Sequence, residues 1–296
     1  MSRSFSQEIK IGIIGGAGPL AGTYLIQKII EICQKEYGSN QDAEFPHMLL
    51  LNYPFSDMLS QEIEPKKIES ELQSCFQFFA RNQVQYAAIA CNTLHIFLPK
   101  ILHFGFGLNE IQDDSEESSD FGLEDRGILL PLPIEKNKNS SKKPRYLLNN
   151  QKTQAKSFEG VKLIHLVQET KDYLNRHPMK KPLILCSSTS AKYALHAQFF
   201  PCEYPDTETQ KKLDTLIAQV NAGGCLQEAA GLLAQLIEGI DTVVLGCSEL
   251  SVIHQRHPLF HPNLCDPMQI IAEKLCKLTK NKEQSSSNSE EPVYTS

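Results

Sequence analysis

Short apolar runs alternate with amphipathic stretches along most of the chain, and this alternation predicts an α/β fold built on parallel sheets. The apolar runs end in small or polar residues, which is typical of strands buried on both faces. We expect strands at 9–14, 47–51, 86–90, 161–166, 182–186, 242–246 and 264–265. The apolar spacing between them predicts helices at 19–37, 65–82, 93–102, 168–176, 191–199, 206–220, 226–239 and 268–278.

The pattern breaks in the middle of the chain and divides it into parts. Residues 1–104 predict one α/β half, which residues 265–280 complete, and residues 158–264 predict a second. Residues 105–157 hold an acidic block, a basic block and a proline-broken apolar run, so we expect a flexible polar insertion there. The serine- and glutamate-rich residues 281–296 predict a disordered tail.

Two stretches of the chain read almost alike, and each ends in a cysteine. Ala-Ala-Ile-Ala precedes Cys91 and Val-Val-Leu-Gly precedes Cys247, and polar residues that suit a helix start follow both. The carboxyl end of a parallel strand is where open α/β sheets bind their ligands. We therefore expect two similar parallel-sheet α/β domains with the active site in the cleft between them.

A matched pair of thiols is suited to inverting a carbon that carries an acidic proton. One thiolate removes the proton from one face while the other thiol returns a proton to the opposite face. A thiol has a reference pKa of about 8.5, and we expect the helix starts after Cys91 and Cys247 to lower it toward neutrality. The alternative is that both are buried, inert structural cysteines.

A glycine-rich turn follows the first predicted strand. Gly16-x-Gly18-x-x-Ala21 fits the permissive dinucleotide-binding pattern, but the second strand ends in Asn-Tyr-Pro rather than in the acidic residue that holds a ribose. A tight strand-to-helix turn is the simplest interpretation. The one we favour adds that the backbone at Gly16 and Gly18 passes close to a small anionic substrate.

Composition narrows the classes of partner. The net charge is −6, and the short basic clusters lack interleaved aromatic residues, so we expect no nucleic-acid partner. We expect no membrane association because no apolar run reaches the ~20 residues that span a bilayer. A polar N-terminal stretch without a signal-peptide core predicts a cytoplasmic protein whose nine cysteines are reduced thiols.

Other chemistries have weak support in the sequence. His254, His257, His261 and Cys265 are close in sequence, but two prolines interrupt the segment, so we expect no metal site there. No G-x-S-x-G elbow of a serine hydrolase occurs, and no local pattern marks a pyridoxal-phosphate lysine.

Four motifs, in order, resemble those of the aspartate/glutamate racemase family, and its aspartate-racemase-like branch in particular. They read IIGGAGPLA at 13–21, CNTLH at 91–95, IHLV at 164–167 and LGCSEL at 245–250. The resemblance implies two similar α/β domains, a homodimer and a reaction that needs no cofactor, metal or nucleotide. It implies that Cys91 and Cys247 are the two acid–base thiols and that the substrate is a small-molecule amino acid.

The resemblance also implies roles for polar residues around the thiols. Asn92 and Thr93 would bind the α-carboxylate, Ser248 would assist from the other side, and Glu249 would orient or polarise the second thiol. A glutamate favoured by the helix dipole is the alternative for Glu249. Ser187 and Ser190 stand where the family has two threonines, so the hydroxyl groups are retained.

The sequence departs from the family where the side-chain carboxylate of aspartate would be held. Aspartate-specific members carry an arginine after the second strand, whereas Met58 stands near that place here, and Lys192 is a candidate replacement. The substrate is therefore left open among aspartate, glutamate and a broader set of amino acids. Two other functions stay open: an isomerase or decarboxylase acting on a non-amino-acid carboxylate or a hydantoin, and a non-catalytic amino-acid-binding relative.

Overall fold

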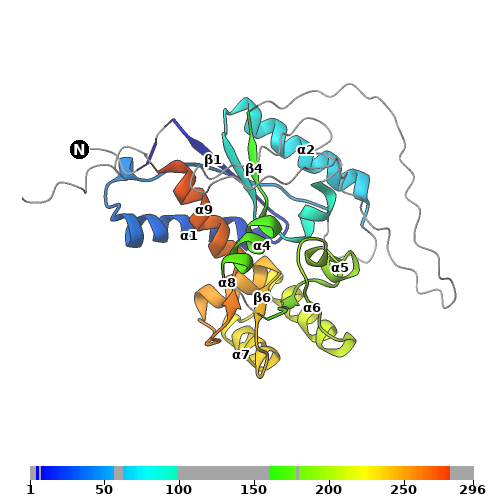
Figure 1. Cartoon of the computed structure of the whole chain (residues 1–296). Helices are drawn as coiled ribbons and strands as arrows, with labels where there is room; N and C mark the ends of the chain where they lie inside the picture. The colour runs from blue at the N-terminus through cyan, green and yellow to red at the C-terminus, as the bar shows by residue number, and fades with distance from the viewer. Residues whose placement is uncertain (1–4, 7, 57–62, 99–159, 178–179, 281–296) are drawn as a thin grey trace, which may run out of the picture.

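Two parallel sheets organise the part of the chain that the computed structural model describes, residues 5–6, 8–56, 63–98, 160–177 and 180–280 (Figure 1). The larger sheet has four strands in the order β2-β1-β3-β4, and all three pairings are parallel. Its strands are β1 (Lys10–Gly15), β2 (His47–Asn52), β3 (Tyr86–Ile89) and β4 (Lys162–Ile164).

Helices cover both faces of this sheet. They pack closely on β1 because the strand has a glycine facing each side. A Cβ at Gly12 would lie 2.7 Å from the Phe79 ring, so helix α2 (Pro65–Arg81) packs closely on that face. A Cβ at Gly15 would lie 3.1 Å from the Gly22 Cα, so helix α1 (Pro19–Tyr37) packs on the other. Helix α9 (Pro267–Thr279) contacts both α1 and α4 (Leu166–Arg176).

The smaller sheet has three strands in the order β5-β6-β7, again all parallel. Its strands are β5 (Leu183–Leu185), β6 (Val243–Leu245) and β7 (Leu264–Cys265). Helices α6 (Thr207–Asn221), α7 (Leu226–Ile237) and α8 (Ser248–Arg256) bury one of its faces. Side chains on the other face, Ile184 and Val244, belong to the same hydrophobic cluster as β1 and α9, so the two sheets share one core.

The parallel α/β architecture predicted from the apolar pattern is confirmed, with corrections. Strand β4 pairs with β3 in the larger sheet, so the smaller sheet does not begin with the segment at 158. The helix expected at 191–199 is two short pieces, α5 (Ser188–Lys192) and the 3-10 turn η3 (His196–Gln198), because Ala194 adopts a left-handed φ of 49°.

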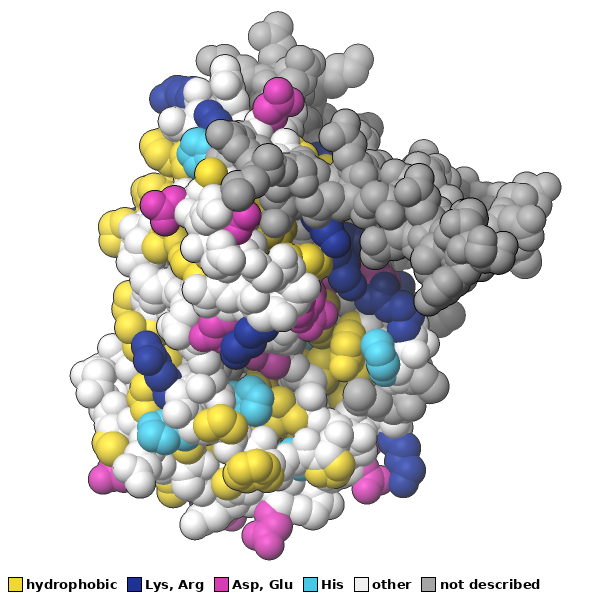
Figure 2. All heavy atoms as spheres, turned by 90° about the vertical axis from the view of Figure 1, so that its left-hand side faces the viewer, with side chains coloured by type: hydrophobic (Ala, Val, Ile, Leu, Met, Phe, Trp, Pro, Cys, Tyr) yellow, Lys and Arg dark blue, Asp and Glu magenta, His cyan; other side chains and the backbone are white. Residues whose placement is uncertain are grey.

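Several expectations lie outside the described residues, namely the insertion at 105–157, the tail at 281–296 and the position of Met58. The segment after Cys91 begins as a 3-10 turn, η2 (Thr93–Phe97), rather than as an α-helix. None of the helices in the described ranges is long and apolar enough to cross a membrane. The face in Figure 2 mixes acidic, basic and hydrophobic side chains.

A buried carboxylate joins elements from both sheets. The Tyr24 hydroxyl on α1 donates to Asp266 Oδ2 at 2.8 Å, and the Ser251 hydroxyl on α8 donates to Asp266 Oδ1 at 2.7 Å. The backbone N–H of Met268 also donates to Oδ1, so Asp266 caps α9. The two hydroxyls therefore connect α1 and α8 through one side chain.

We predict that Tyr24→Phe destabilises the protein more than Ser251→Ala does. Tyr24→Phe deprives Oδ2 of its donor, whereas Oδ1 keeps the Met268 N–H after Ser251→Ala. A buried acceptor left without its donor costs about 1–3 kcal/mol. Urea unfolding measures both free energies, and equal losses in the two variants would contradict the prediction.

Candidate active site

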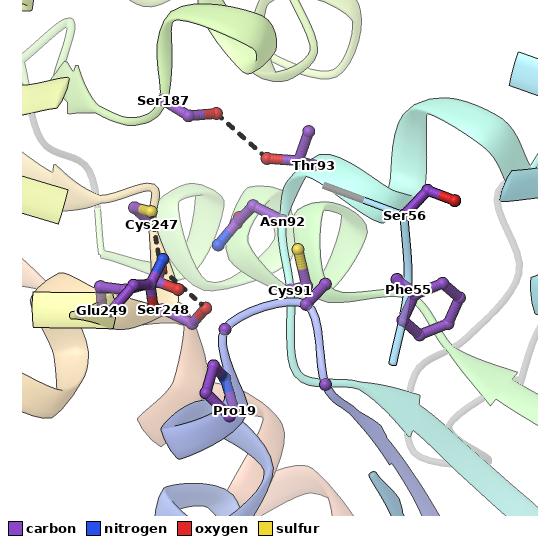
Figure 3. A pocket seen from close by; sticks show the side chains of 14 residues that line it. Pro19, Phe55, Ser56, Cys91, Asn92, Thr93, Ser187, Cys247, Ser248 and Glu249 are labelled. Carbon is purple, nitrogen blue, oxygen red and sulfur yellow. Dashed lines mark hydrogen bonds between the residues drawn. The ribbon is translucent and has the colours of Figure 1, made fainter. Parts of the chain in front are cut away.

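A cavity of about 250 Å³ lies where the carboxyl ends of strands from both sheets meet (Figure 3). Its walls come from the segments that follow β1, β2, β3, β5 and β6 and from the end of α6. The lining residues are Gly16, Ala17, Gly18, Pro19, Phe55, Ser56, Cys91, Asn92, Thr93, Ser187, Asn221, Cys247, Ser248 and Glu249. A space below the ~300–1,000 Å³ of drug-sized pockets suits a molecule as small as an amino acid.

The two thiols reach this cavity from different sheets. Cys91 follows β3 of the larger sheet and Cys247 follows β6 of the smaller one, and each is 7% exposed. In Figure 3 they lie on either side of Asn92. The structure therefore brings together the two cysteines that the near-repeat in the sequence singled out.

The Cys91 thiol accepts hydrogen bonds from the turn that follows it. The backbone N–H groups of Thr93 and Leu94 and the Thr93 hydroxyl bond to the sulfur, because the first N–H groups of η2 have no partner within the turn. The His95 Nδ1–H donates to the Cys91 carbonyl at 2.8 Å and fixes the backbone there. Burial and the charge of Glu249 outweigh these donors and raise the pKa of Cys91 to about 12.

The Cys247 thiol donates to a carboxylate. Its Sγ lies 2.8 Å from Glu249 Oε2 and donates a hydrogen bond to it. The Ser248 hydroxyl donates to the same oxygen at 3.3 Å. Burial, then the Glu249 charge and this hydrogen bond, raise the pKa of Cys247 well above its usual value. The expectation that helix starts lower both thiol pKa values is wrong here, since desolvation and Glu249 outweigh the backbone N–H groups.

The glycine turn makes room for this carboxylate. Gly18 has a φ of 85°, and a Cβ there would come within 2.0 Å of Glu249 Oε1. Gly16 has a φ of 102°, and a Cβ there would come within 1.7 Å of the Tyr53 carbonyl oxygen. Both positions therefore require glycine for conformation and for space.

Three hydroxyl groups form a cluster at the edge of the cavity. Thr93 Oγ1 lies 3.1 Å from Ser187 Oγ and 3.0 Å from Ser190 Oγ, and all three residues are buried. Ser187 also caps α5 by accepting from the Ser190 N–H. This cluster joins the segments that follow β3 and β5.

Asn92 supplies an unused donor beside the thiols. Its side chain is 2% exposed, and Nδ2 finds no hydrogen-bond partner among the described residues. Its Oδ1 lies 3.3 Å from His196 Nε2. A buried donor that lines a cavity and lacks an acceptor is available to an anionic ligand.

All the site residues predicted from the sequence line the cavity except Ser190, whose hydroxyl is hydrogen-bonded to that of Ser187. Sequence reasoning missed Phe55 and Ser56, although their place just after a strand end was a signal that could have found them. It also missed Asn221, for which the end of a predicted helix gives no such signal. Lys192 is not part of the described lining.

The histidines of the weak metal candidate bond to the backbone instead. His254 Nδ1 accepts from the Leu259 N–H at 3.1 Å, and His261 Nε2–H donates to the Ile240 carbonyl at 2.8 Å. Among the described residues, no group of three or more metal-ligating side chains is close enough to hold an ion.

We compared the chain with known proteins. No protein-family model matches the chain. The broad specificity amino-acid racemase RacX of Bacillus subtilis is 22% identical over 251 residues, which cover 82% of this chain and 86% of RacX. This chain is therefore similar to an amino-acid racemase over most of its length.

Two solved structures share the fold of this chain. The aspartate racemase of Picrophilus torridus has a TM-score of 0.61 at 16% identity and covers 93% of this chain and 97% of its own. An aspartate racemase homologue from Pyrococcus horikoshii has a TM-score of 0.57 at 18% identity, covering 91% and 98%. Both likenesses concern the fold alone.

We predict that Glu249→Gln makes both cavity thiols react faster with iodoacetamide at pH 8. Removing the charge lowers the pKa of Cys91 and of Cys247, because Glu249 raises both. An interaction of about 1 kcal/mol corresponds to roughly fivefold more thiolate. Mass spectrometry of the alkylated peptides measures the rates, and the exposed Cys225 is the internal control. Unchanged or slower alkylation of Cys91 and Cys247 would contradict this.

Proposed function

We propose that this protein racemises an amino acid by two-thiol proton transfer at the α-carbon, without a cofactor. The observation that carries the proposal is the placement of Cys91 and Cys247, from two different sheets, on one small cavity. An inert structural role would not require both thiols beside polar groups such as Asn92 and Glu249.

The reaction conserves protons within the site. The thiolate of one cysteine takes the α-proton, and the electron pair of the broken C–H bond moves into the carboxylate to give an enediolate. The thiol of the other cysteine then protonates the opposite face of the α-carbon. The inverted amino acid leaves, and the thiolate is now on the other cysteine, ready for the reverse direction.

The donors for the α-carboxylate come from the segments that follow β3 and β5. Asn92 Nδ2 is unpartnered, and the hydroxyls of Thr93 and Ser187 line the same wall. These donors would also stabilise the extra negative charge of the enediolate. Gly16 and Gly18 let the backbone approach the substrate, and Ser248 lies on the opposite side.

Glu249 would generate the first thiolate. Its carboxylate already accepts the Cys247 S–H hydrogen bond, so the proton has a short path to Oε2. The α-ammonium group of the substrate would favour the resulting thiolate, because an opposite charge nearby lowers a thiol pKa.

Racemisation is tested by following the α-proton of each amino acid in heavy water by NMR. In a two-thiol reaction the product enantiomer carries solvent deuterium, while the unreacted enantiomer keeps protium at early conversion. Each thiol exchanges protons with only one face of the α-carbon, so deuterium enters the product enantiomer first. No deuterium at the α-carbon of any L- or D-amino acid would refute racemisation and leave the non-catalytic binding relative.

The single-thiol variants Cys91→Ala and Cys247→Ala should each lose at least about a hundredfold in racemisation rate, the range of general acid–base catalysis. Cys202→Ala, outside the cavity lining, is the matched control with unchanged rate. A decarboxylase or isomerase that uses one thiol would keep its activity in one of the two variants. Full racemisation in either variant would remove the two-thiol mechanism.

We also propose that the substrate side chain is uncharged. The described lining holds one carboxylate, Glu249, and no lysine or arginine, and the aromatic ring of Phe55 occupies the wall next to Ser56. The sequence that follows Ser56, Asp-Met-Leu-Ser-Gln-Glu at 57–62, contains no lysine or arginine. A second substrate carboxylate would enter this space without a counter-charge, which is unfavourable.

Isosteric amides and acids test this preference. We expect kcat/KM for L-glutamine and L-asparagine to exceed that for L-glutamate and L-aspartate by about tenfold or more, since tenfold is 1.4 kcal/mol. Each pair differs in charge at nearly constant size, so fit to the cavity is controlled. Equal or higher kcat/KM for the dicarboxylates would contradict the preference and leave racemisation intact.

From the family resemblance we also propose that the protein is a cytoplasmic homodimer. Sedimentation equilibrium of the full chain tests the oligomeric state, and a monomer at all concentrations would contradict it.

A further inference from the structure

We propose that His196 is a positioning residue that holds the Asn92 carboxamide with its Nδ2 group turned toward the cavity. What Nδ2 binds rests on the proposed function, whereas the orientation of the amide does not. The contact joins the two halves of the site, since Asn92 follows β3 and His196 begins η3.

The two side chains meet in a buried place. His196 Nε2 lies 3.3 Å from Asn92 Oδ1, and the two residues are 1% and 2% exposed. Water therefore does not compete for this hydrogen bond. Burial lowers the pKa of His196 to about 3, so the imidazole is neutral and carries one N–H at physiological pH.

Hydrogen-bond accounting selects the arrangement. With the proton on Nε2, the ring donates to Asn92 Oδ1 and leaves His196 Nδ1 as a bare acceptor. With the amide turned round, Asn92 Nδ2 would donate to Nε2, and the proton would move to Nδ1, which has no acceptor among the described residues. Either way two buried N–H bonds lack an acceptor among the described residues: both are on Asn92 Nδ2 in the first arrangement, whereas one is on Nδ2 and one on His196 Nδ1 in the second. The first arrangement puts both at the wall of the cavity, which Asn92 lines and His196 does not, so a bound anion can accept them.

The surroundings hold the ring in place. The Tyr204 hydroxyl accepts from the backbone N–H groups of His196 and Ala197 at 3.1 and 3.2 Å. A Cβ at Gly246 would lie 3.2 Å from His196 Cε1, so the glycine before Cys247 leaves space for the imidazole. The left-handed Ala194 turns the chain out of α5 and into η3. A backbone conformation this unfavourable persists only when its surroundings enforce it.

The consequence is a donor oriented before the substrate arrives. Asn92 Nδ2 has no partner among the described residues and would gain one when a carboxylate binds. A donor already fixed in direction loses little rotational freedom at that moment, and it can follow the growing charge of the enediolate. Without His196 the amide could rotate and present its oxygen to the anion instead.

The tautomer of His196 tests the orientation without any assay of activity. Long-range ¹H–¹⁵N NMR of the histidine-labelled protein distinguishes Nε2–H from Nδ1–H, and loss of one signal in His196→Gln assigns it. We expect the neutral Nε2–H form between pH 5 and 9. The Nδ1–H form would overturn the proposal, because Nε2 would then accept from a reversed Asn92 amide.

A double-mutant cycle tests the function of the contact with the substrate that the wild-type protein racemises best. We expect His196→Leu to lower kcat/KM by about ten- to a hundredfold, in line with 1–3 kcal/mol for a lost buried hydrogen bond. His196→Gln, which keeps an N–H donor near the Nε2 position, should restore most of it. In Asn92→Ala the further change His196→Leu should cost less than about threefold. Equal losses in both backgrounds would mean a merely structural role.

His254→Leu is the matched control, because it removes another imidazole, which is partly buried. His254 Nδ1 accepts from the Leu259 N–H, and His254 lies outside the described cavity lining. We expect a lower unfolding midpoint with kcat/KM within about twofold of wild type. A tenfold loss in this variant would show that the loss in His196→Leu does not report on the contact with Asn92 and would overturn the positioning role. Absence of racemisation in the wild-type protein would refute the proposed function and leave the tautomer result to decide the orientation.

Discussion

The hydrogen bond from the Cys247 thiol to the Glu249 carboxylate is the contact on which the arrangement of the site depends. It is 2.8 Å long and buried, and it places a negative charge beside both thiols. The turn at Gly18 is shaped around that carboxylate, and the Ser248 hydroxyl donates to it. A single buried charge therefore connects the first turn of the chain to the second thiol, and together with burial it raises the pKa of both thiols.

The sequence was sufficient for those parts of the fold and site that depend on local pattern. Buried parallel strands are continuous apolar runs, and side chains just after such runs meet at one edge, so Cys91, Cys247 and their polar neighbours were predictable. Sheet membership was not predictable, since β4 is as apolar as the strands of either sheet and its pairing with β3 is a long-range choice. The break at Ala194 was missed because a helix-favouring residue adopts the left-handed conformation there.

The electrostatics of the thiols were the least predictable part. A helix start after a cysteine is visible in the sequence, but the degree of burial is a property of the assembled core. Burial acts on both thiols more strongly than the backbone donors do. Glu249 was visible next to Cys247, whereas its influence on Cys91 requires that the two sheets be brought together. His196 had no sequence signal, because its partner Asn92 lies 104 residues away.

The core shared by the two sheets has a mechanical consequence. One face of the smaller sheet, through Ile184 and Val244, packs into the cluster that supports β1 and α9. Separating the sheets as rigid bodies would expose that face to water, which opposes a wide hinge motion. Side-chain packing away from the cavity therefore fixes how far apart the segments that carry Cys91 and Cys247 lie. Methyl groups of this shared core, none of which needs to touch a ligand, set the dimensions of the cavity.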